Sequence, residues 1–289
     1  IISSEEIINK LKNNEDIKYS GITIKGNIDF TLLKQNDSPC INQIEIKSKM
    51  VFYNCVFDGY ISTIGDTYSI DDDSVNLCFV NFAKELEFKH CTFNNRTIFT
   101  KSTFFDKVNF SNIDFKSLVY FSASKFKTTS NFSSSNFYDK VYIKASKFDG
   151  KLYFNDCEIK ERIWFTGSTI MTGSDFSHNY YNKEVFYSNT QFFDKVNFIG
   201  NTFTSDVYFN GALFFKEMYI DNSKFMAYAS FFKALFKAYA SFENVYFEKK
   251  ADFKYTSFNV SPNFNGVVFN NGAEFTGAVL NGKPFNPLE

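Results

Sequence analysis

Histidine and cysteine are the side chains best suited to acid–base, nucleophilic or metal chemistry at neutral pH. This sequence has only two histidines, His90 and His178, which lie 88 residues apart, and its cysteines form no CxxC pair. No GxSxG, HExxH or glycine-rich phosphate-binding motif occurs. The sequence therefore predicts a protein that is not an enzyme, with no catalytic residues and no cofactor or metal. The five cysteines are Cys40, Cys55, Cys78, Cys91 and Cys157.

An acidic stretch is the one remaining candidate for a metal site. Asp66 and the run from Asp71 to Asp73 fall within residues 63–76. A Ca²⁺ loop alternates its oxygen ligands and has a glycine at the turn, and this stretch lacks both the spacing and the glycine. We therefore expect a solvated surface loop. The scattered cysteines do not form a disulfide framework either, so we expect reduced thiols and a cytoplasmic protein.

The sequence repeats with a period of eleven residues, and the strands that would position any functional residue must follow this period. If Phe88 is position 1, then Phe93 is position 6 and Phe99 begins the next unit. Nineteen consecutive units start at residues 77 to 275, and phenylalanine occupies position 1 in fifteen of them and position 6 in fifteen. Thirty of the 40 phenylalanines therefore fall at two positions. The same register continues towards the N-terminus in units starting at Tyr19, Phe30, Ile41 and Phe52, and it breaks at 63–76.

Positions 4 and 10 carry small or short-branched residues, two places before the large residues at positions 6 and 1. Residues two apart on a strand point the same way. The pattern within each unit therefore predicts a strand, a corner, a second strand and a second corner. Two units then close a coil of about 22 residues. Coils stack at about 4.8 Å, which places His90 and His178 four coils and roughly 19 Å apart. The polar corners exclude the alternative of a helical supercoil.

The pairing of a small residue with Leu or Phe two places later resembles the pentapeptide-repeat family, in its Phe-rich variant in which two pentapeptides carry one extra residue. Examples are Ser102/Phe104, Val108/Phe110, Cys157/Ile159, Ala212/Phe214 and Ala234/Phe236. The resemblance covers residues 19–285. It implies an all-β solenoid, a right-handed quadrilateral β-helix with a dry interior.

The first residues have a different pattern. Ser3 and Glu6 form a capping box, and Ile7, Ile8 and Leu11 make one apolar face. An open β-helix end exposes unpaired backbone, and a short helix over residues 3–14 would cover it. We therefore divide the chain into an N-terminal capping helix, 1–18, and a β-helix, 19–289, with a loop insertion at 63–76.

If the interior is uniform, function must lie on the outside. Position 11 points outward in the middle of a strand, and alternate units share a face. One face carries six consecutive large apolar or aromatic residues, a stripe roughly 25 Å long. They are Ile98, Tyr120, Tyr142, Trp164, Phe186 and Tyr208.

Two explanations of this stripe stay open. It is either a stacking ladder that stabilises the sheet or a binding or dimerisation face, because soluble monomers seldom expose a long apolar patch. Arg96, Lys140 and Arg162 are aligned at position 9 of the same units, and Glu184 and Asp206 follow them. Since acids are interspersed, this column is expected to be a solvated rim.

The leading prediction is a non-enzymatic protein-interaction or scaffold module that homodimerises through the aromatic face, with its protein partner not identified by these residues. A resemblance to family members that protect DNA gyrase by imitating DNA is the first alternative. Such a protein needs a strongly acidic rod, and the net charge here is −1, so nucleic-acid-like behaviour and nucleic-acid binding are both disfavoured. The second alternative is the soluble rod of a membrane-anchored parent protein. No apolar run here reaches the ~18–20 residues of a spanning helix.

Overall fold

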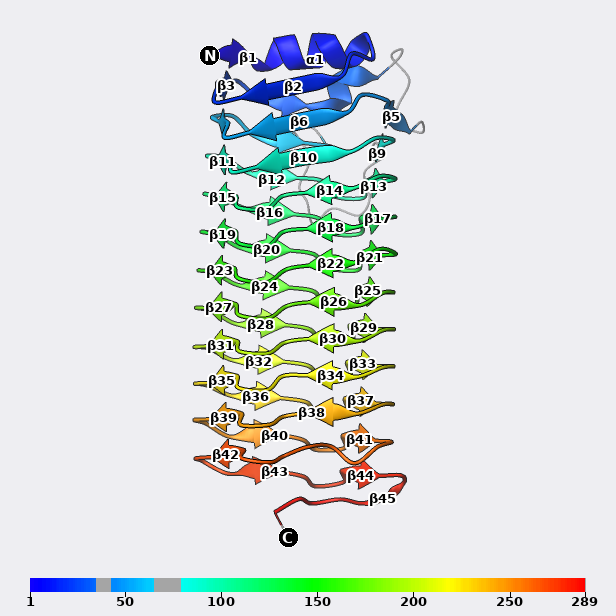
Figure 1. The fold of residues 1–289 in the computed structure, drawn as a ribbon, viewed down its shortest axis with the longest axis vertical. Helices are drawn as coiled ribbons and strands as arrows, with labels where there is room; N and C mark the ends of the chain where they lie inside the picture. Colours follow the sequence, from blue (N-terminus) through cyan, green and yellow to red (C-terminus); the bar gives the residue numbers. More distant parts are fainter. Residues whose placement is uncertain (35–42, 65–78, 289) are drawn as a thin grey trace.

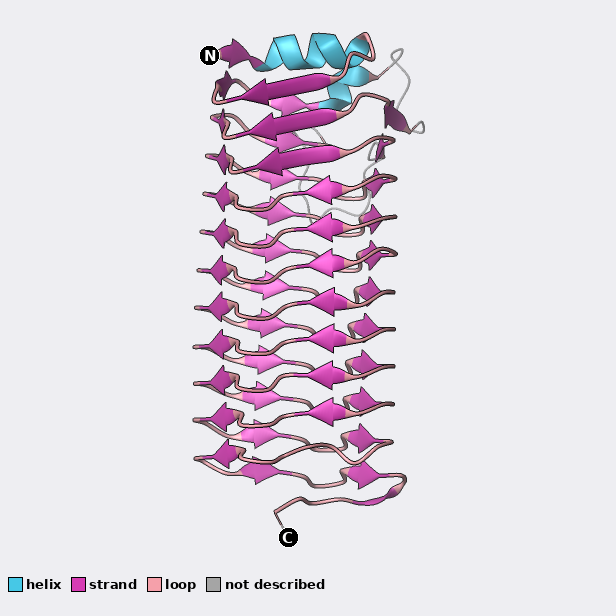
Figure 2. Cartoon of the chain, in the orientation of Figure 1, coloured by secondary structure: helices cyan, strands magenta, loops and turns pink. Residues whose placement is uncertain are grey.

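The computed structural model describes residues 1–34, 43–64 and 79–288 of the 289-residue chain. These residues form a rod of stacked coils, and each complete coil contributes one short strand to each of four sheets (Figures 1 and 2). We label the four sheets A to D. Successive strands along the chain belong to sheets B, A, C and D in turn, so that sheet B lies opposite sheet C and sheet A lies opposite sheet D. The predicted four-sheet solenoid is confirmed.

The strands of each sheet follow the stacking of the coils. Sheet A contains β1 (Ile2–Ser3), β3 (Thr23–Lys25), β7 (Val56–Phe57), β11 (Thr92–Phe93), β15 (Asp114–Phe115), β19 (Asn136–Phe137), β23 (Glu158–Ile159), β27 (Tyr180–Tyr181), β31 (Thr202–Phe203), β35 (Lys224–Phe225), β39 (Tyr246–Phe247) and β42 (Val268–Phe269). Sheet B contains β2 (Ile17–Ser20), β6 (Met50–Tyr53), β10 (Leu86–Lys89), β14 (Val108–Asn109), β18 (Ser130–Asn131), β22 (Leu152–Tyr153), β26 (Ser174–Asp175), β30 (Val196–Asn197), β34 (Met218–Tyr219) and β38 (Ala240–Ser241).

The other two sheets are built in the same way. Sheet C contains β4 (Ile28–Asp29), β8 (Ile61–Ser62), β12 (Thr97–Ile98), β16 (Val119–Tyr120), β20 (Val141–Tyr142), β24 (Ile163–Trp164), β28 (Val185–Phe186), β32 (Val207–Tyr208), β36 (Ala229–Ser230), β40 (Ala251–Asp252) and β43 (Ala273–Glu274). Sheet D contains β5 (Ile44–Ile46), β9 (Val80–Phe82), β13 (Thr103–Phe104), β17 (Lys125–Phe126), β21 (Lys147–Phe148), β25 (Thr169–Ile170), β29 (Gln191–Phe192), β33 (Leu213–Phe214), β37 (Leu235–Phe236), β41 (Ser257–Phe258), β44 (Val279–Leu280) and β45 (Lys283–Pro284).

From β9 to β44, neighbouring strands of a sheet pair in parallel, and paired residues are two repeat units apart, as in Phe104 opposite Phe126 and Val119 opposite Val141. This confirms that two units close one coil. Identical inward residues therefore lie one above the other. The rings of Phe126 and Phe148 stack with centroids 4.6 Å apart and planes 3° apart. Stacked and edge-to-face phenyl rings fill the rod, and this repeated packing explains why one residue type is used so heavily.

The register at the N-terminal end differs from the prediction. With two units per coil, Tyr19 would lie over Ile41, but Tyr19 pairs with Phe52, which begins the third unit after it. Phe30 begins a short 3₁₀ helix, η1 (Phe30–Leu33), and the next strand is β5. Eleven additional residues therefore lie between β4 and β5, while Ile46 and Met50 of the unit placed at Ile41 occupy their expected inward positions; Ile41 itself lies outside the described residues. Because the insertion is as long as one unit, the period could not reveal it.

The predicted loop at 63–76 begins inside a coil. Thr63 is buried, and its amide donates to the carbonyl oxygen of Ile98 at 3.0 Å, so this residue continues sheet C. Residues 65–76 lie outside the described residues.

The two corners of each unit have different backbones. Position 3, between a sheet B strand and a sheet A strand or between C and D, has a positive φ in unit after unit, for example 56° at Ala123 and 69° at Gly200. No described residue at the other kind of corner, positions 7 to 9, has a positive φ between Phe88 and Val260. Position 3 therefore favours glycine or asparagine, although alanine, lysine and histidine also occupy it.

Small polar residues at position 4 form a ladder inside the first kind of corner. The Ser146 hydroxyl donates to the Phe121 carbonyl at 2.6 Å and accepts from the Ser124 amide at 3.3 Å, both in the coil before it. Ser124 and Ser168 repeat the donation. Each hydroxyl thus satisfies backbone groups that the turn would otherwise bury without partners.

Helix α1 (Ser4–Lys12) lies across the N-terminal end of the rod (Figure 1). The Ser3 hydroxyl accepts from the Glu6 amide, and Ile7, Ile8 and Leu11 are buried, so the predicted short helix is confirmed. At the other end, β45 turns back and pairs antiparallel with β44. The ring of Phe285, which follows β45, packs on Phe258 at 5.6 Å.

Candidate functional site: the aromatic ladder of sheet C

The outward position 11 of sheet C carries a continuous stack of rings. Tyr120, Tyr142 and Trp164 are separated by 4.6 Å per step with planes 3° and 5° apart. Phe186 and Tyr208 follow at 5.4 and 5.2 Å. We call these five residues the aromatic ladder. They come from five successive strands, β16 to β32, which hold one ring per coil.

Ile98, which the sequence placed at the start of this stripe, is 2% exposed, whereas all five ladder rings are partly exposed. Thr100 beside Ile98 is also buried. The accessible stripe is therefore shorter than predicted, and it starts at Tyr120.

Because the rings are parallel and in contact, each ring face within the ladder is covered by its neighbour. The ladder therefore presents ring edges to the outside and cannot offer its internal faces to a sugar or a base. The exposed edges are apolar, with the hydroxyls of the tyrosines among them. The Lys144 ammonium lies 5.2 Å from the ring centroids of both Tyr142 and Trp164 and so adds a cation at the ladder's side.

The ladder ends where polar residues replace rings. Tyr228 packs against Tyr208 at 6.2 Å and 59°, and its hydroxyl donates to buried Asp252 at 2.7 Å. Burial, together with this hydrogen bond to Asp252, raises the pKa of Tyr228 to about 12. Below Tyr208, Ser230 and Asp252 continue the column, both buried.

A charged column runs beside the ladder at position 9. Arg162 donates two hydrogen bonds of 2.9 Å to Glu184, its neighbour in the next coil. This contact holds the pKa of the Glu184 carboxyl below its ordinary value. Asp206 accepts from the Tyr208 hydroxyl and from the Tyr228 amide, both at 3.1 Å. The column and the ladder therefore form one surface.

A second apolar patch lies on sheet D and was not predicted, because position 7 was not compared from coil to coil. At position 7, Phe193 and Phe215 stack at 4.3 Å, and Met171 one coil earlier is exposed. Leu213 and Leu235 stand beside them at position 5 and are partly exposed. Examining position 7 in the same way as position 11 would have found this patch.

Of the residues able to do chemistry, Cys55 and Cys91 lie in neighbouring coils and touch, since the Cys55 amide donates to the Cys91 sulfur at 3.4 Å. His90 and His178 lie on exposed corners with positive φ. Cys55, Cys91 and Cys157 are free and buried, and burial raises the pKa of the Cys91 and Cys157 thiols to about 12. Cys40 and Cys78, like Asp66 and the Asp71–Asp73 run, lie outside the described residues. Across the described ranges, no three His, Cys, Asp or Glu side chains are grouped to hold a metal ion.

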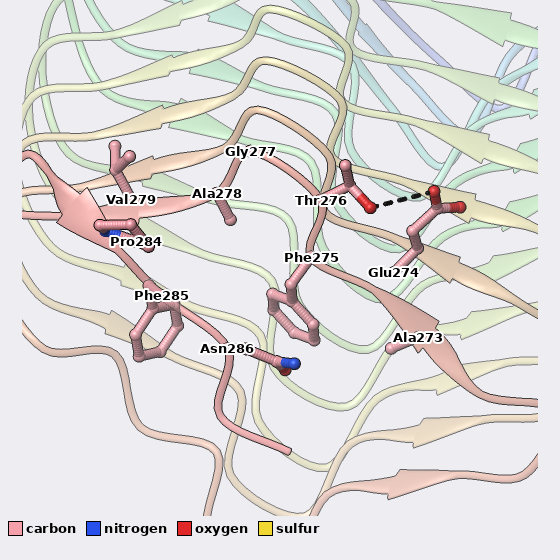
Figure 3. Close-up of a pocket in the computed structure, with 10 residues that line it drawn as sticks. All are labelled: Ala273, Glu274, Phe275, Thr276, Gly277, Ala278, Val279, Pro284, Phe285 and Asn286. Carbon is pink, nitrogen blue, oxygen red and sulfur yellow. Dashed lines mark hydrogen bonds between the residues drawn. The ribbon is translucent and has the colours of Figure 1, made fainter. Parts of the chain in front are cut away.

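An open hollow lies at the C-terminal end of the rod, between the last coil and the returning segment (Figure 3). The rings of Phe275 and Phe285 and the amide of Asn286 border it, and the Thr276 hydroxyl donates to Glu274 at 3.4 Å. Glu274 is the one ionisable side chain among its lining residues.

Comparison with known proteins supports the repeat. Residues 132–178 match the family model described as pentapeptide repeats (9 copies). No curated protein and no solved structure matches the chain. Among the residues that the structure describes, no helix has the length and apolar character needed to cross a membrane.

Proposed function

Because this chain is a pentapeptide-repeat β-helix protein, we propose that it is a non-enzymatic protein-interaction or scaffold module that homodimerises through the aromatic ladder of sheet C. The observation that carries the proposal is the ladder itself. Five large rings stand in line on an outer face and are partly exposed. In the coils beyond Tyr208, the residue at the same position of sheet C is small or acidic. Tyrosine and tryptophan are enriched where proteins meet proteins.

A purely stabilising role would be satisfied by the ring-to-ring contacts alone, since those contacts use the faces. The edges, which carry the apolar surface of Trp164 and Phe186, gain nothing from stacking and remain in water in a lone rod. Covering them with a protein surface would remove apolar area from water at roughly 25 cal/mol per Å². This is the reason to prefer an interaction face to a ladder that acts only within the rod.

The charge of the molecule weighs against imitation of DNA. A rod that imitates DNA needs a dense negative surface, and here the net charge is −1 with 31 basic and 32 acidic residues. Lys140 and Arg162 stand directly beside the ladder. Such a face favours a protein partner of mixed charge.

Self-association of the purified chain tests the proposal. We expect sedimentation velocity to show concentration-dependent association that Trp164→Ser and Phe186→Ser weaken. Tyr153→Ser is the matched control, because Tyr153 holds the same position on sheet B. A chain that stays monomeric at every concentration, or one that Tyr153→Ser weakens equally, would remove the proposal.

The emission of the one tryptophan gives a second measurement. Trp164 stands in the ladder, so its accessibility to a soluble quencher should fall as the protein concentration rises. Unchanged quenching across the range in which the mass increases would place the contact elsewhere.

A further inference from the structure

The charges of the column beside the aromatic ladder are antisymmetric: when the order of the residues is reversed, basic residues take the places of acidic ones. Position 9 of the sheet C units runs apolar, basic, basic, acidic, acidic, apolar, with one residue per coil. These residues are Leu118, Lys140, Arg162, Glu184, Asp206 and Tyr228. If the column is read backwards from its midpoint between Arg162 and Glu184, each charge meets its opposite.

We propose that the ladder's partner is a second copy of this chain, packed face to face and antiparallel, with a two-fold axis between the coils of Trp164 and Phe186. The inference rests on the proposed function and adds to it the direction of the two-fold axis and the register of the two copies. A two-fold contact is made by the same patch on both copies, so such a patch must be complementary to itself. The order of this column meets that condition.

The direction of the axis follows from the column. A two-fold axis parallel to the strands of sheet C keeps position 9 of one copy opposite position 9 of the other and reverses the coil order. Lys140 of each copy then faces Asp206 of the other, and Arg162 faces Glu184. A two-fold axis along the rod would instead place position 9 opposite position 2, where no such order of charge exists.

The same operation aligns the two ladders. Trp164 of one copy comes opposite Phe186 of the other, and Tyr142 opposite Tyr208, so that the ring edges meet over the axis. Lys144, beside the ring of Tyr142, comes opposite Asn210 rather than another cation. The apolar ends of the column, Leu118 and Tyr228, also face each other.

The charges supply direction and specificity. Arg162 and Glu184 already pair within each chain, and the two-fold axis sets two such pairs side by side with opposite polarity. Within the described ranges, neither Lys140 nor Asp206 has an ion-pair partner in its own chain. Each gains a partner in the pair. In the two registers shifted by two coils, Lys140 would instead face another base, Arg162 or Lys250.

The order is confined to this stretch of this face. On sheet B the corresponding column contains lysines at Lys107, Lys151 and Lys195 between acids at Glu85 and Glu217, so its charges read the same in both directions and are not antisymmetric. On sheet C, the next residues outward, Arg96 and Lys250, are both basic. Each is engaged by its own chain, because Arg96 lies 4.9 Å from the Tyr60 ring centroid and Lys250 pairs with Glu274.

Mixing two single variants tests the register. In Lys140→Asp every Lys140–Asp206 contact between copies becomes acid against acid, and in Asp206→Lys it becomes base against base. We expect each variant alone to self-associate at least about tenfold more weakly than the wild type. An equimolar mixture should form a heterodimer in which both contacts are again between opposite charges, with an affinity within about threefold of the wild type.

Three measurements make the result decisive. The double variant Lys140→Asp/Asp206→Lys should also regain association, and Lys151→Asp on sheet B should leave it unchanged. Circular dichroism must show that the single variants keep the β-helix. If Asp206→Lys misfolds through loss of its hydrogen bonds to Tyr208 and Tyr228, Lys140→Asp with Asp206→Asn replaces the mixture and should regain part of the association.

The outcomes separate this inference from the function on which it rests. A mixture no tighter than its components would overturn the antiparallel register, even where Trp164→Ser still weakens self-association. Loss of association in Trp164→Ser but not in either charge variant would have the same meaning. A chain that never self-associates would remove both.

Discussion

The hydroxyls of Tyr181 and Tyr187 lie 3.2 Å apart in the interior of the rod, at positions that phenylalanine fills in most other units. Both side chains are fully buried. The Asn179 amide donates to the Tyr181 hydroxyl at 3.0 Å and to the carbonyl oxygens of Phe154 and Phe176. One polar network is therefore enclosed within an otherwise apolar core, and it is satisfied by its own members.

This network predicts that two substitutions cost less than one. Tyr181→Phe leaves the Tyr187 hydroxyl buried without a partner, which should destabilise the protein by about 1–3 kcal/mol. Tyr187→Phe should cost less, because Tyr181 keeps Asn179. The double variant should be more stable than Tyr181→Phe, since both hydroxyls are gone and Asn179 keeps two carbonyl acceptors. Urea unfolding measures the cycle, and additive losses would contradict the prediction.

The corner at position 3 predicts a stabilising substitution. Ala123 is exposed and has a φ of 56°, a conformation that costs an L-residue about 1–2 kcal/mol relative to glycine. Ala123→Gly should therefore raise the free energy of unfolding by about 0.5–1 kcal/mol after the entropic cost of glycine. Ala238→Gly is the control, because Ala238 lies at the other kind of corner without a positive φ, and it should lower the thermal midpoint. A loss of stability in both variants would count against the prediction.

The buried thiols predict slow alkylation. With a pKa of about 12, Cys91 and Cys157 hold roughly a thousandfold less thiolate at pH 8 than an ordinary cysteine. In a Cys40→Ser/Cys78→Ser background, iodoacetamide should therefore label the native protein at least about a hundredfold more slowly than the protein in guanidinium. Mass spectrometry of the tryptic peptides reads each site. Rapid labelling of either thiol in the native state would show that the coil around it opens.

The Arg162–Glu184 contact predicts a modest pH dependence. Because Arg162 lowers the pKa of Glu184 in the folded state, the contact stabilises above the unfolded-state pKa of about 4.3 and is lost as the pH falls through the folded value. For a partly exposed pair we expect less than about 1 kcal/mol, reduced further by salt. Glu184→Gln should therefore lower stability at pH 7 and have almost no effect near pH 2. Glu217→Gln, at position 9 of sheet B, is the control. Measurements belong below the concentration at which the chain associates.

Much of the fold followed from the spacing of one residue type. Phe88, Phe93 and Phe99 set the period, and inward residues must recur wherever identical coils stack. The helix at Ser4–Lys12 followed from its cap and apolar face. The register at Tyr19 could not be predicted from the spacing, because an insertion as long as one unit leaves the period unchanged. The aromatic ladder was visible as a column once coils of two units were assumed, and the sheet D patch would have been visible in the same way.

By itself the sequence determined the solenoid, the two inward phenylalanine positions and the alignment of Tyr120 to Tyr208 on one face, because a strict period leaves each residue one place in the coil. Only the tertiary structure decided how those aligned residues meet. Ile98 is buried although its position points outward, and the rings from Tyr120 onward cover one another's faces and leave their edges outside. Burial and ring orientation depend on what lies above and beside a residue in space, and a period in the chain carries no record of either.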